Sequence, residues 1–158
     1  MKSPFSRRSL GVESLIELRG TPFDPYIELV HYQSAHLNQA GKFGATSIFV
    51  GAMRDVNEGD AVRAMRLEHY PGMTERELAR IAEEAQRRWD LLSTLVIHRV
   101  GDILPGQTIV LAAVWSAHRG AAFDATRYIV EALKHRAPFW KKETLEQGER
   151  WVEGNTPV

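Results

Sequence analysis

The segment Thr108–Ala117, TIVLAAVWSA, constrains the fold more than any other part of the chain because its side chains are almost all apolar. A run of this length and composition is typical of a strand that is buried on both faces. The residues His118-Arg119-Gly120 follow it directly, and residues 121–136 then carry a helical pattern. We therefore expect this strand to lie in the middle of a sheet, with a helix that begins close to its end.

Strand and helix patterns alternate along the rest of the chain. A turn signal at Asn57–Asp60 separates two strand patterns, and we expect those two strands to pair antiparallel. Pro138 ends the helix of residues 121–136, because proline cannot continue a helix and favours extended geometry in the residue before it. The expected strands span residues 14–19, 45–53, 61–70, 94–100 and 108–117.

Capping residues predict where two further helices begin. Asp24 precedes Pro25, which predicts an N-cap and a first helical residue for a helix that runs to about Asn38. Thr74 and Glu77 form a capping box, which predicts a second helix with Thr74 as its N-cap and with Met73 packed on Leu78. The buried stripe of that helix should contain Leu78, Ile81, Ala82, Ala85 and Trp89, and that of the helix at 121–136 should contain Phe123, Thr126, Val130 and Leu133.

A chain of 158 residues with 44% hydrophobic residues has the size and composition of one globular domain. Residues 1–12 are interpreted as a loose N-terminal tail and residues 13–158 as the domain. No stretch has the length and apolarity of a signal peptide or a membrane span, so a cytoplasmic location is expected.

The charge balance and the absence of cysteine exclude several classes of function. Lys plus Arg and Asp plus Glu number 20 each, so no global field attracts nucleic acid or a membrane surface. The chain contains no cysteine, which excludes a disulfide, a thiolate metal site and a persulfide carrier. The histidines show no metal-ligand spacing, and no cofactor is expected. If the protein handles sulfur, that sulfur comes from another molecule.

The segment KHRAPFWKKE, Lys134–Glu143, gathers cations around a proline. Beyond Pro138 the chain should be extended, so Lys141 and Glu143 point to the same side. Lys134 can fold back towards Lys141 across the bend, and two neighbouring ammonium groups lower each other's pKa, as a lysine that transfers protons requires. The alternative is a solvated edge strand whose lysines prevent aggregation.

Three other residues are candidates for an anion site. Arg54 follows the strand at 45–53, and His118 and Arg119 lie where a strand passes into a helix, a junction suited to phosphate. Salt bridges from Arg54 to Asp55 or Glu58 are the alternative for the first residue. An ordinary helix start is the alternative for the other two.

Six segments, in this order, resemble the large catalytic subunit of molybdopterin synthase: FVGAMRDVNEGD, LEHYPGMTE, HRVGDILPGQTIV, SAHRGAAFDA, LKHRAPFWKKE and GERWVE. Together they span about residues 44–153. The resemblance implies an α+β fold of the α/β hammerhead type, with a mixed, largely antiparallel sheet packed against helices in a single domain. It also implies a homodimer at the centre of a heterotetramer, with a small ubiquitin-like sulfur-carrier subunit bound at each end.

The resemblance further implies a sulfurtransferase activity. In that family the carrier's C-terminal Gly-Gly thiocarboxylate delivers sulfur to cyclic pyranopterin monophosphate, and two rounds form the dithiolene of molybdopterin. Many members carry an arginine where this chain has Asn155. A non-catalytic adaptor for a ubiquitin-like tail, and another phosphate-ester enzyme, are the alternatives. Carried over by position, the catalytic residues are Lys134 and Lys141, and the substrate contacts are Ala52, Met53, Arg54, His118, Arg119, Lys142 and Glu143.

Overall fold

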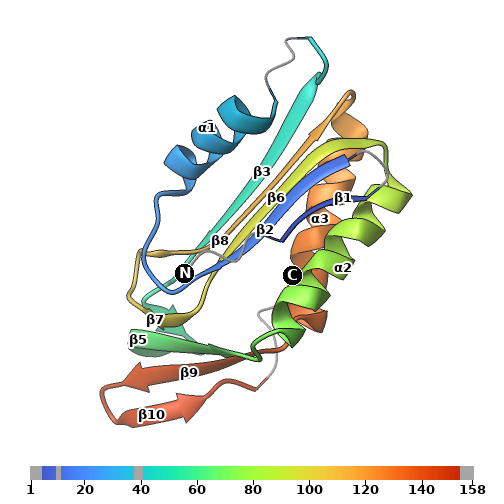
Figure 1. The fold of residues 1–158 in the computed structure, drawn as a ribbon. Helices are drawn as coiled ribbons and strands as arrows, with labels where there is room; N and C mark the ends of the chain where they lie inside the picture. The colour runs from blue at the N-terminus through green and yellow to red at the C-terminus, as the bar shows by residue number, and fades with distance from the viewer. Residues whose placement is uncertain (1–4, 10–11, 38–40, 154–158) are drawn as a thin grey trace.

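The computed structural model describes residues 5–9, 12–37 and 41–153, which form two sheets and three helices (Figure 1). The larger sheet has the strand order β1-β2-β6-β8-β3, and the smaller one has the order β10-β9-β5-β4 with β7 also paired to β5. The elements are β1 (Phe5–Ser9), β2 (Val12–Arg19), α1 (Pro25–His36), β3 (Ala45–Ala52), β4 (Val56–Asn57), β5 (Asp60–His69), α2 (Met73–Arg88), β6 (Leu91–Arg99), β7 (Gly101–Ile103), β8 (Thr108–Ser116), α3 (Arg119–Arg136), β9 (Phe139–Leu145) and β10 (Gly148–Trp151).

Strand β8 lies inside the larger sheet, as the apolar run predicts. It pairs antiparallel with β6 on one side and with β3 on the other. Alternate residues point to opposite faces, so Val114 packs beneath α2 and α3 while Trp115 packs towards α1. Both side chains are completely buried. This two-sided burial makes β8 the centre of the fold.

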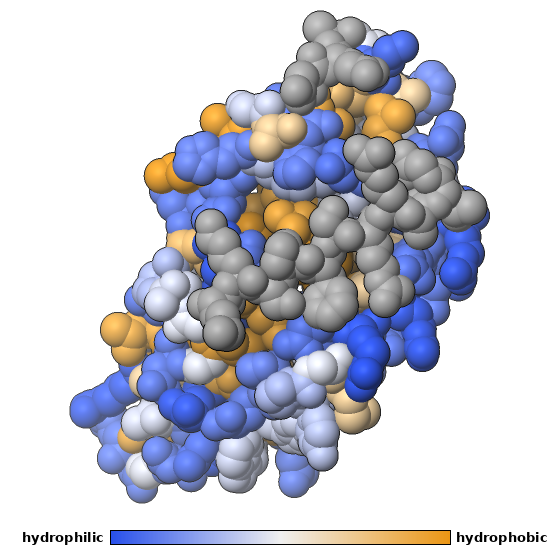
Figure 2. All heavy atoms as spheres, in the orientation of Figure 1, coloured by the Kyte–Doolittle hydropathy of each residue, from blue (hydrophilic) through white to orange (hydrophobic). Residues whose placement is uncertain are grey.

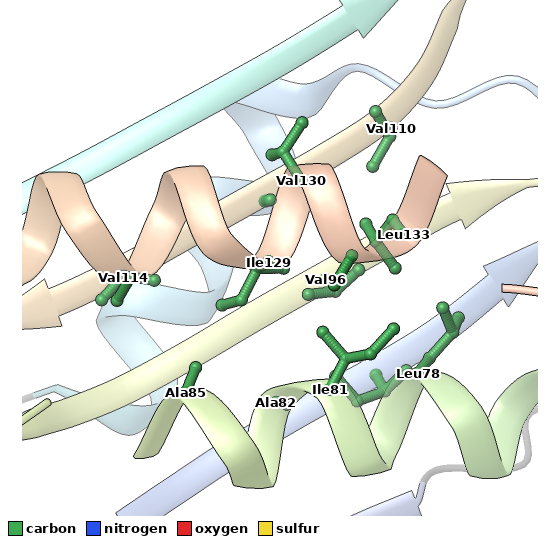
Figure 3. Packing of buried hydrophobic residues seen from close by; sticks show 14 of the residues in the cluster. Leu78, Ile81, Ala82, Ala85, Val96, Val110, Val114, Ile129, Val130 and Leu133 are labelled. Atoms are coloured by element: carbon green, nitrogen blue, oxygen red, sulfur yellow. The ribbon is translucent and has the colours of Figure 1, made fainter. Parts of the chain in front are cut away.

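Helices α2 and α3 lie side by side on one face of the larger sheet (Figures 1 and 3). Ile81 from α2 and Ile129 from α3 meet over Val96 of β6 and are fully buried. The stripe predicted for α2 is confirmed at Leu78, Ile81, Ala82 and Ala85, whereas Trp89 is partly buried and follows the last helical residue. The opposite side of α2 carries charged residues, and in Figure 2 hydrophilic side chains cover the surface along this helix.

The stripe predicted for α3 is wrong at one position. Phe123 is 65% exposed, and the smaller residues Ala122 and Ala125 are buried in its place. These alanines lie on the row that continues to Ile129, and their size lets the helix approach the sheet closely. Thr126, Val130 and Leu133 are buried as predicted.

The predicted pairing of residues 45–53 with 61–70 is also wrong. Strand β3 pairs with β8, and a register shift between Gly51 and Ala52 marks the point where the chain leaves the larger sheet. The turn itself is confirmed, but its first strand is the two-residue β4, with Asn57 opposite Asp60. Glu58 and Gly59 between them have φ values of 52° and 81°, the consecutive positive φ angles that suit a tight hairpin.

The predicted capping of α1 is confirmed and that of α2 is corrected. The Asp24 side chain accepts hydrogen bonds from the backbone N–H groups of Tyr26 and Ile27. Helix α2 begins two residues earlier than predicted, because Gly72 adopts a φ of 84° and its N–H donates to the Glu75 carboxylate.

Thr74 therefore has a different role from the predicted cap. Its hydroxyl accepts from the backbone N–H of Tyr70 and donates to the carbonyl of Pro138. Met73 is half exposed and does not act as a staple. Thr74 thus ties the start of α2 to the junction between α3 and β9.

The loose tail predicted for residues 1–12 is corrected in part. Residues 5–9 form β1, which pairs antiparallel with β2 at the edge of the larger sheet. The backbone groups of β1 pair with those of β2, and this pairing does not require apolar side chains. The polar sequence FSRRS therefore gives little sign of a strand. Residues 1–4 and 10–11 lie outside the described part of the chain, as does Asn38, the predicted end of the first helix.

The contact between α2 and the sheet gives a stability prediction. Ile81→Ala should lower the free energy of unfolding by about 2–5 kcal/mol, because it removes buried methyl groups and leaves a cavity. The matched control is Ile27→Ala on α1, where the side chain is 54% exposed and the change should stay within about 0.5 kcal/mol. Urea denaturation of both variants measures the difference, and equal losses would contradict this account of the core.

Candidate functional site

A cavity of about 550 Å³ is lined by residues of both sheets and by the last turns of α3. Its volume lies in the range of small-molecule sites. Its lining contains apolar residues, among them Val110 from β8, Leu133 from α3 and Phe139 from β9. It also contains charged groups. The predicted site residues among its lining are Ala52, Met53, Arg54, Lys134, Lys141 and Glu143.

The bend at Pro138 brings the two predicted lysines into this cavity. Lys134 lies in the last turn of α3, and Ala137 adopts the extended φ of −69° and ψ of 131° before the proline. Lys141 then follows on β9, where Phe139, Lys141 and Glu143 alternate onto the cavity side as predicted. Trp140 between them is exposed on the other face.

Lys141 lies in surroundings that disfavour its charged form. Burial is the main cause that lowers the pKa of its ammonium group below the ordinary range, and the charges of Lys134 and Arg54 add to this effect. The charge of Glu143 opposes it. The predicted lowering of a lysine pKa is thus found for Lys141, with burial as a larger cause than the neighbouring lysine.

The three cations of the cavity make no ion pair with any described residue. Salt bridges from Arg54 to Asp55 or Glu58, the alternative considered from the sequence, are not formed among the described residues. Lys134 and Lys141 likewise have no carboxylate partner within the described chain. Positive groups from three segments therefore face a common space and can receive an anion.

Glu143 is held by two residues that the sequence analysis did not single out as site residues. Its side chain is buried, with 4% of the residue exposed. One carboxylate oxygen accepts from Asn57 Nδ2 at 2.7 Å, and the other accepts from Arg150 Nε at 3.0 Å. The predicted turn at Asn57–Asp60 gives a local signal for the first of these. Arg150 becomes recognisable only when β10 is seen opposite β9.

His98 is a further residue of the cavity that is not among the predicted site residues. Its Nδ1–H donates to the carbonyl of Arg99 at 2.8 Å. The ring also stacks on Phe139, with centroids 4.2 Å apart and planes inclined by 17°. Burial lowers the pKa of His98 to about 4, so the imidazole is neutral at physiological pH. Both rings line the cavity and add an uncharged aromatic part to its lining.

The comparisons with known proteins decide the family. The family described as MoaE protein matches residues 25–136, well over half of the chain. The molybdopterin synthase catalytic subunit of Ralstonia nicotianae is 55% identical over 112 residues, which cover 71% of this chain and 64% of that protein. The one from Pseudomonas aeruginosa is 50% identical over 139 residues, covering 88% and 90%.

The chain belongs to the MoaE family. A crystal structure of molybdopterin synthase from Staphylococcus aureus has a TM-score of 0.76 at 31% identity and covers 87% of this chain and 96% of that chain. The family expected from the sequence is confirmed, and so is the α+β class of the fold.

Not every residue carried over from the MoaE family reaches the cavity. His118 and Arg119 lie at the start of α3, and the rise of the helix places them about 22 Å from Lys134 at its other end. Lys142 points to the opposite face of β9, where it pairs with Glu149 at 2.7 Å. The expectation that all these residues share one pocket is wrong for a single MoaE chain. The length of α3 separates the first two, and strand alternation separates the third.

Two other features are absent from the described part of the MoaE chain. Within residues 5–9, 12–37 and 41–153, no three His, Asp or Glu side chains are arranged to hold a metal ion. In the same described residues, no helix combines the length and the apolarity that a membrane crossing requires.

The lowered pKa of His98 predicts a pH dependence of stability. The unfolded chain binds a proton at this residue near pH 6.5, whereas the folded chain does so only near pH 4. Stability should therefore decrease as the pH falls from about 6.5 to 4, by up to about 3 kcal/mol. Urea denaturation at several pH values should show that His98→Phe flattens this decrease. An unchanged slope in the variant would contradict the assignment.

Proposed function

We propose that this cavity is where the chain, as the catalytic subunit of a molybdopterin synthase, transfers sulfur to cyclic pyranopterin monophosphate. The observation that carries the proposal is a cavity lined both by the rings of His98 and Phe139 and by Arg54, Lys134 and Lys141, three cations that have no ion-pair partner among the described residues. The substrate combines an anionic phosphate with a planar ring system. The cations suit the phosphate, and the aromatic residues suit the ring system.

The sulfur donor in this proposal is the C-terminal Gly-Gly thiocarboxylate of a small ubiquitin-like carrier subunit. The chain has no cysteine and cannot carry a persulfide itself. In each round the thiocarboxylate sulfur attacks a substrate carbon, so a carbon–sulfur bond forms as a carbon–oxygen bond of the substrate breaks. Water then hydrolyses the thioester between carrier and substrate, which leaves the sulfur on the substrate as a thiolate and releases the carrier as a carboxylate. Because the donor and the phosphate are both anionic, cations from several segments stabilise their approach.

Lys134 and Lys141 are the proposed catalytic residues. The lowered pKa of Lys141 suits proton transfer, because its neutral amine is reached more readily than that of an ordinary lysine. Lys134 is proposed to stabilise the negative charge that develops on the departing oxygen and the new thiolate. Arg54 is proposed to bind the phosphate. The surrounding backbone of Ala52 and Met53 shapes this end of the cavity.

His118 and Arg119 are proposed to act on the phosphate in the cavity of a second copy. They lie too far from Lys134 to act in their own cavity, and the family resemblance implies a homodimer within a heterotetramer. Among the described strands, β3 lies at the edge of the larger sheet with β8 as its neighbour, and its eight residues span about 23 Å. An antiparallel contact between two β3 edges would bring the start of one strand, near His118, to the end of the other, near Arg54.

A cytoplasmic location stays a prediction.

The central test uses Lys134→Ala. Turnover should fall by about 10²-fold or more, because a group that acts on the reacting atoms is lost. Product formation is measured by mass spectrometry after mixing with thiocarboxylated carrier and cyclic pyranopterin monophosphate. Lys42→Ala, at an exposed site before β3, is the matched control and should keep wild-type turnover.

Two outcomes would contradict this assignment. Near-normal turnover by folded Lys134→Ala would show that Lys134 is not catalytic. Binding of the thiocarboxylated carrier by the wild-type protein without any product would favour a non-catalytic adaptor for the carrier tail.

Mixed dimers test the proposed role of Arg119. Lys134→Ala and Arg119→Ala chains, each inactive alone, are co-expressed and purified together. Random pairing makes about half of the dimers mixed, and one of the two cavities in each is then intact, so about a quarter of wild-type activity should return. A mixture that stays inactive would contradict the contribution from a second copy.

A further inference from the structure

We propose that Arg150 is a positioning residue that, together with Asn57, holds the Glu143 carboxylate away from the Lys141 ammonium group and so keeps Lys141 unpaired in the cavity. The inference deepens the proposed function, because it matters for catalysis only if Lys141 is a catalytic lysine. Arg150 itself does not line the cavity and acts through Glu143.

The arrangement of β9 favours an ion pair that is not formed. Lys141 and Glu143 are two residues apart on one strand, so both side chains point to the cavity. In a partly buried setting, a lysine and a glutamate at this spacing attract each other strongly. Nevertheless, no ion pair joins them in the described structure. We infer that other contacts keep the Glu143 carboxylate away from the Lys141 ammonium group.

Both oxygens of that carboxylate are already occupied. Asn57 Nδ2 donates to one oxygen at 2.7 Å, and Arg150 Nε donates to the other at 3.0 Å. A buried carboxylate needs such partners, because an unpaired buried charge is costly. Arg150 and Asn57 meet this need, so Glu143 does not have to turn towards Lys141.

Further contacts hold Arg150 in place. Its Nη1 donates to Asp60 at 2.7 Å, and its Nη2 donates to the backbone carbonyl of Asn57 at 3.0 Å. The register of the small sheet places Arg150 directly opposite Glu143. The tight turn through Glu58 and Gly59 brings Asn57 and Asp60 to the same guanidinium group. The planar fork of arginine is suited to this geometry.

The charges that face Lys141 come from several elements. Arg54 after β3 and Lys134 of α3 disfavour its protonated form, whereas Glu143 of β9 favours it. His98 of β6 is neutral and adds no charge. Glu143 is therefore the anion among these groups that raises the lysine pKa, and its distance from Lys141 sets how far it does so.

The experiment measures the titration of Lys141 directly and needs no substrate. Wild-type protein and variants react briefly with acetic anhydride across a range of pH, and mass spectrometry of the Lys141 peptide gives the midpoint of its reactivity. Arg150→Gln should raise this midpoint, because Glu143 is then free to pair with Lys141. At a pH below the midpoint, the rate should fall about tenfold for each unit of increase.

Three further variants separate this effect from general damage to the fold. Arg150→Lys keeps a cation and should restore most of the wild-type midpoint. The double variant Arg150→Gln with Glu143→Gln has no carboxylate to pair and should lose the upward shift. Arg63→Gln breaks an exposed pair with Glu146 on the same sheet, at 2.7 Å, and should leave the midpoint unchanged. If Arg150→Gln does not fold, Asn57→Ala removes the other hydrogen bond and should shift the midpoint in the same direction.

An unchanged or lowered midpoint in folded Arg150→Gln or Asn57→Ala would overturn the inference. An upward shift that persists in the double variant would overturn it as well, because Glu143 would not be its cause. Turnover is measured separately on the same variants. A raised midpoint with unaltered turnover would contradict the catalytic role of Lys141 and leave the positioning role of Arg150 intact.

Discussion

The junction between α3 and β9 is the constraint on which the site depends. Pro138 has no N–H to continue the helix and forces Ala137 into extended geometry, so the chain turns from the α2–α3 layer into the small sheet within two residues. Lys134 and Lys141 stand on the two sides of this turn and therefore face the same cavity. The carbonyl of Pro138 accepts from Thr74, which fixes the junction to the start of α2. The packing of α2 and α3 on the larger sheet thus determines where β9 begins, and therefore where Lys141 lies.

Local patterns in the sequence predict the parts of the site that a short segment determines. The proline bend and the alternation of β9 place Lys141 and Glu143 correctly, and a strand end is enough to place Arg54. Features that depend on pairing between distant segments are missed. Arg150 reaches Glu143 only because β10 folds onto β9, and His98 meets Phe139 only because the two sheets adjoin. The N-cap predicted for α2 is wrong because Gly72 adopts a positive φ, which the capping pattern at Thr74 does not reveal.

Cations elsewhere on the helices and strands show by contrast what is unusual about the cavity. Arg136 bonds to Glu77 and Glu84 of α2, and Arg19 bonds to Glu17 and Glu28. These pairs attach elements to one another. In the cavity, the one buried carboxylate instead bonds to Asn57 and to an arginine that lies outside the lining. A chain with equal numbers of acidic and basic residues can therefore keep a local excess of positive charge, because its anions are paired elsewhere.

This excess couples the binding of an anion to the protonation of Lys141. Burial and the neighbouring cations lower the pKa of Lys141, and the charge of Glu143 opposes them only in part. An anionic group that enters among the cations adds its charge to that of Glu143, so it raises the lysine pKa further and draws a proton into the site. The linkage is reciprocal, because a protonated Lys141 must then bind the anion more tightly than a neutral one does. In the proposed reaction, the arrival of each anionic reactant would therefore protonate Lys141, and a later oxygen leaving group requires that proton. The separation of Glu143 from Lys141 makes this protonation depend on the reactant.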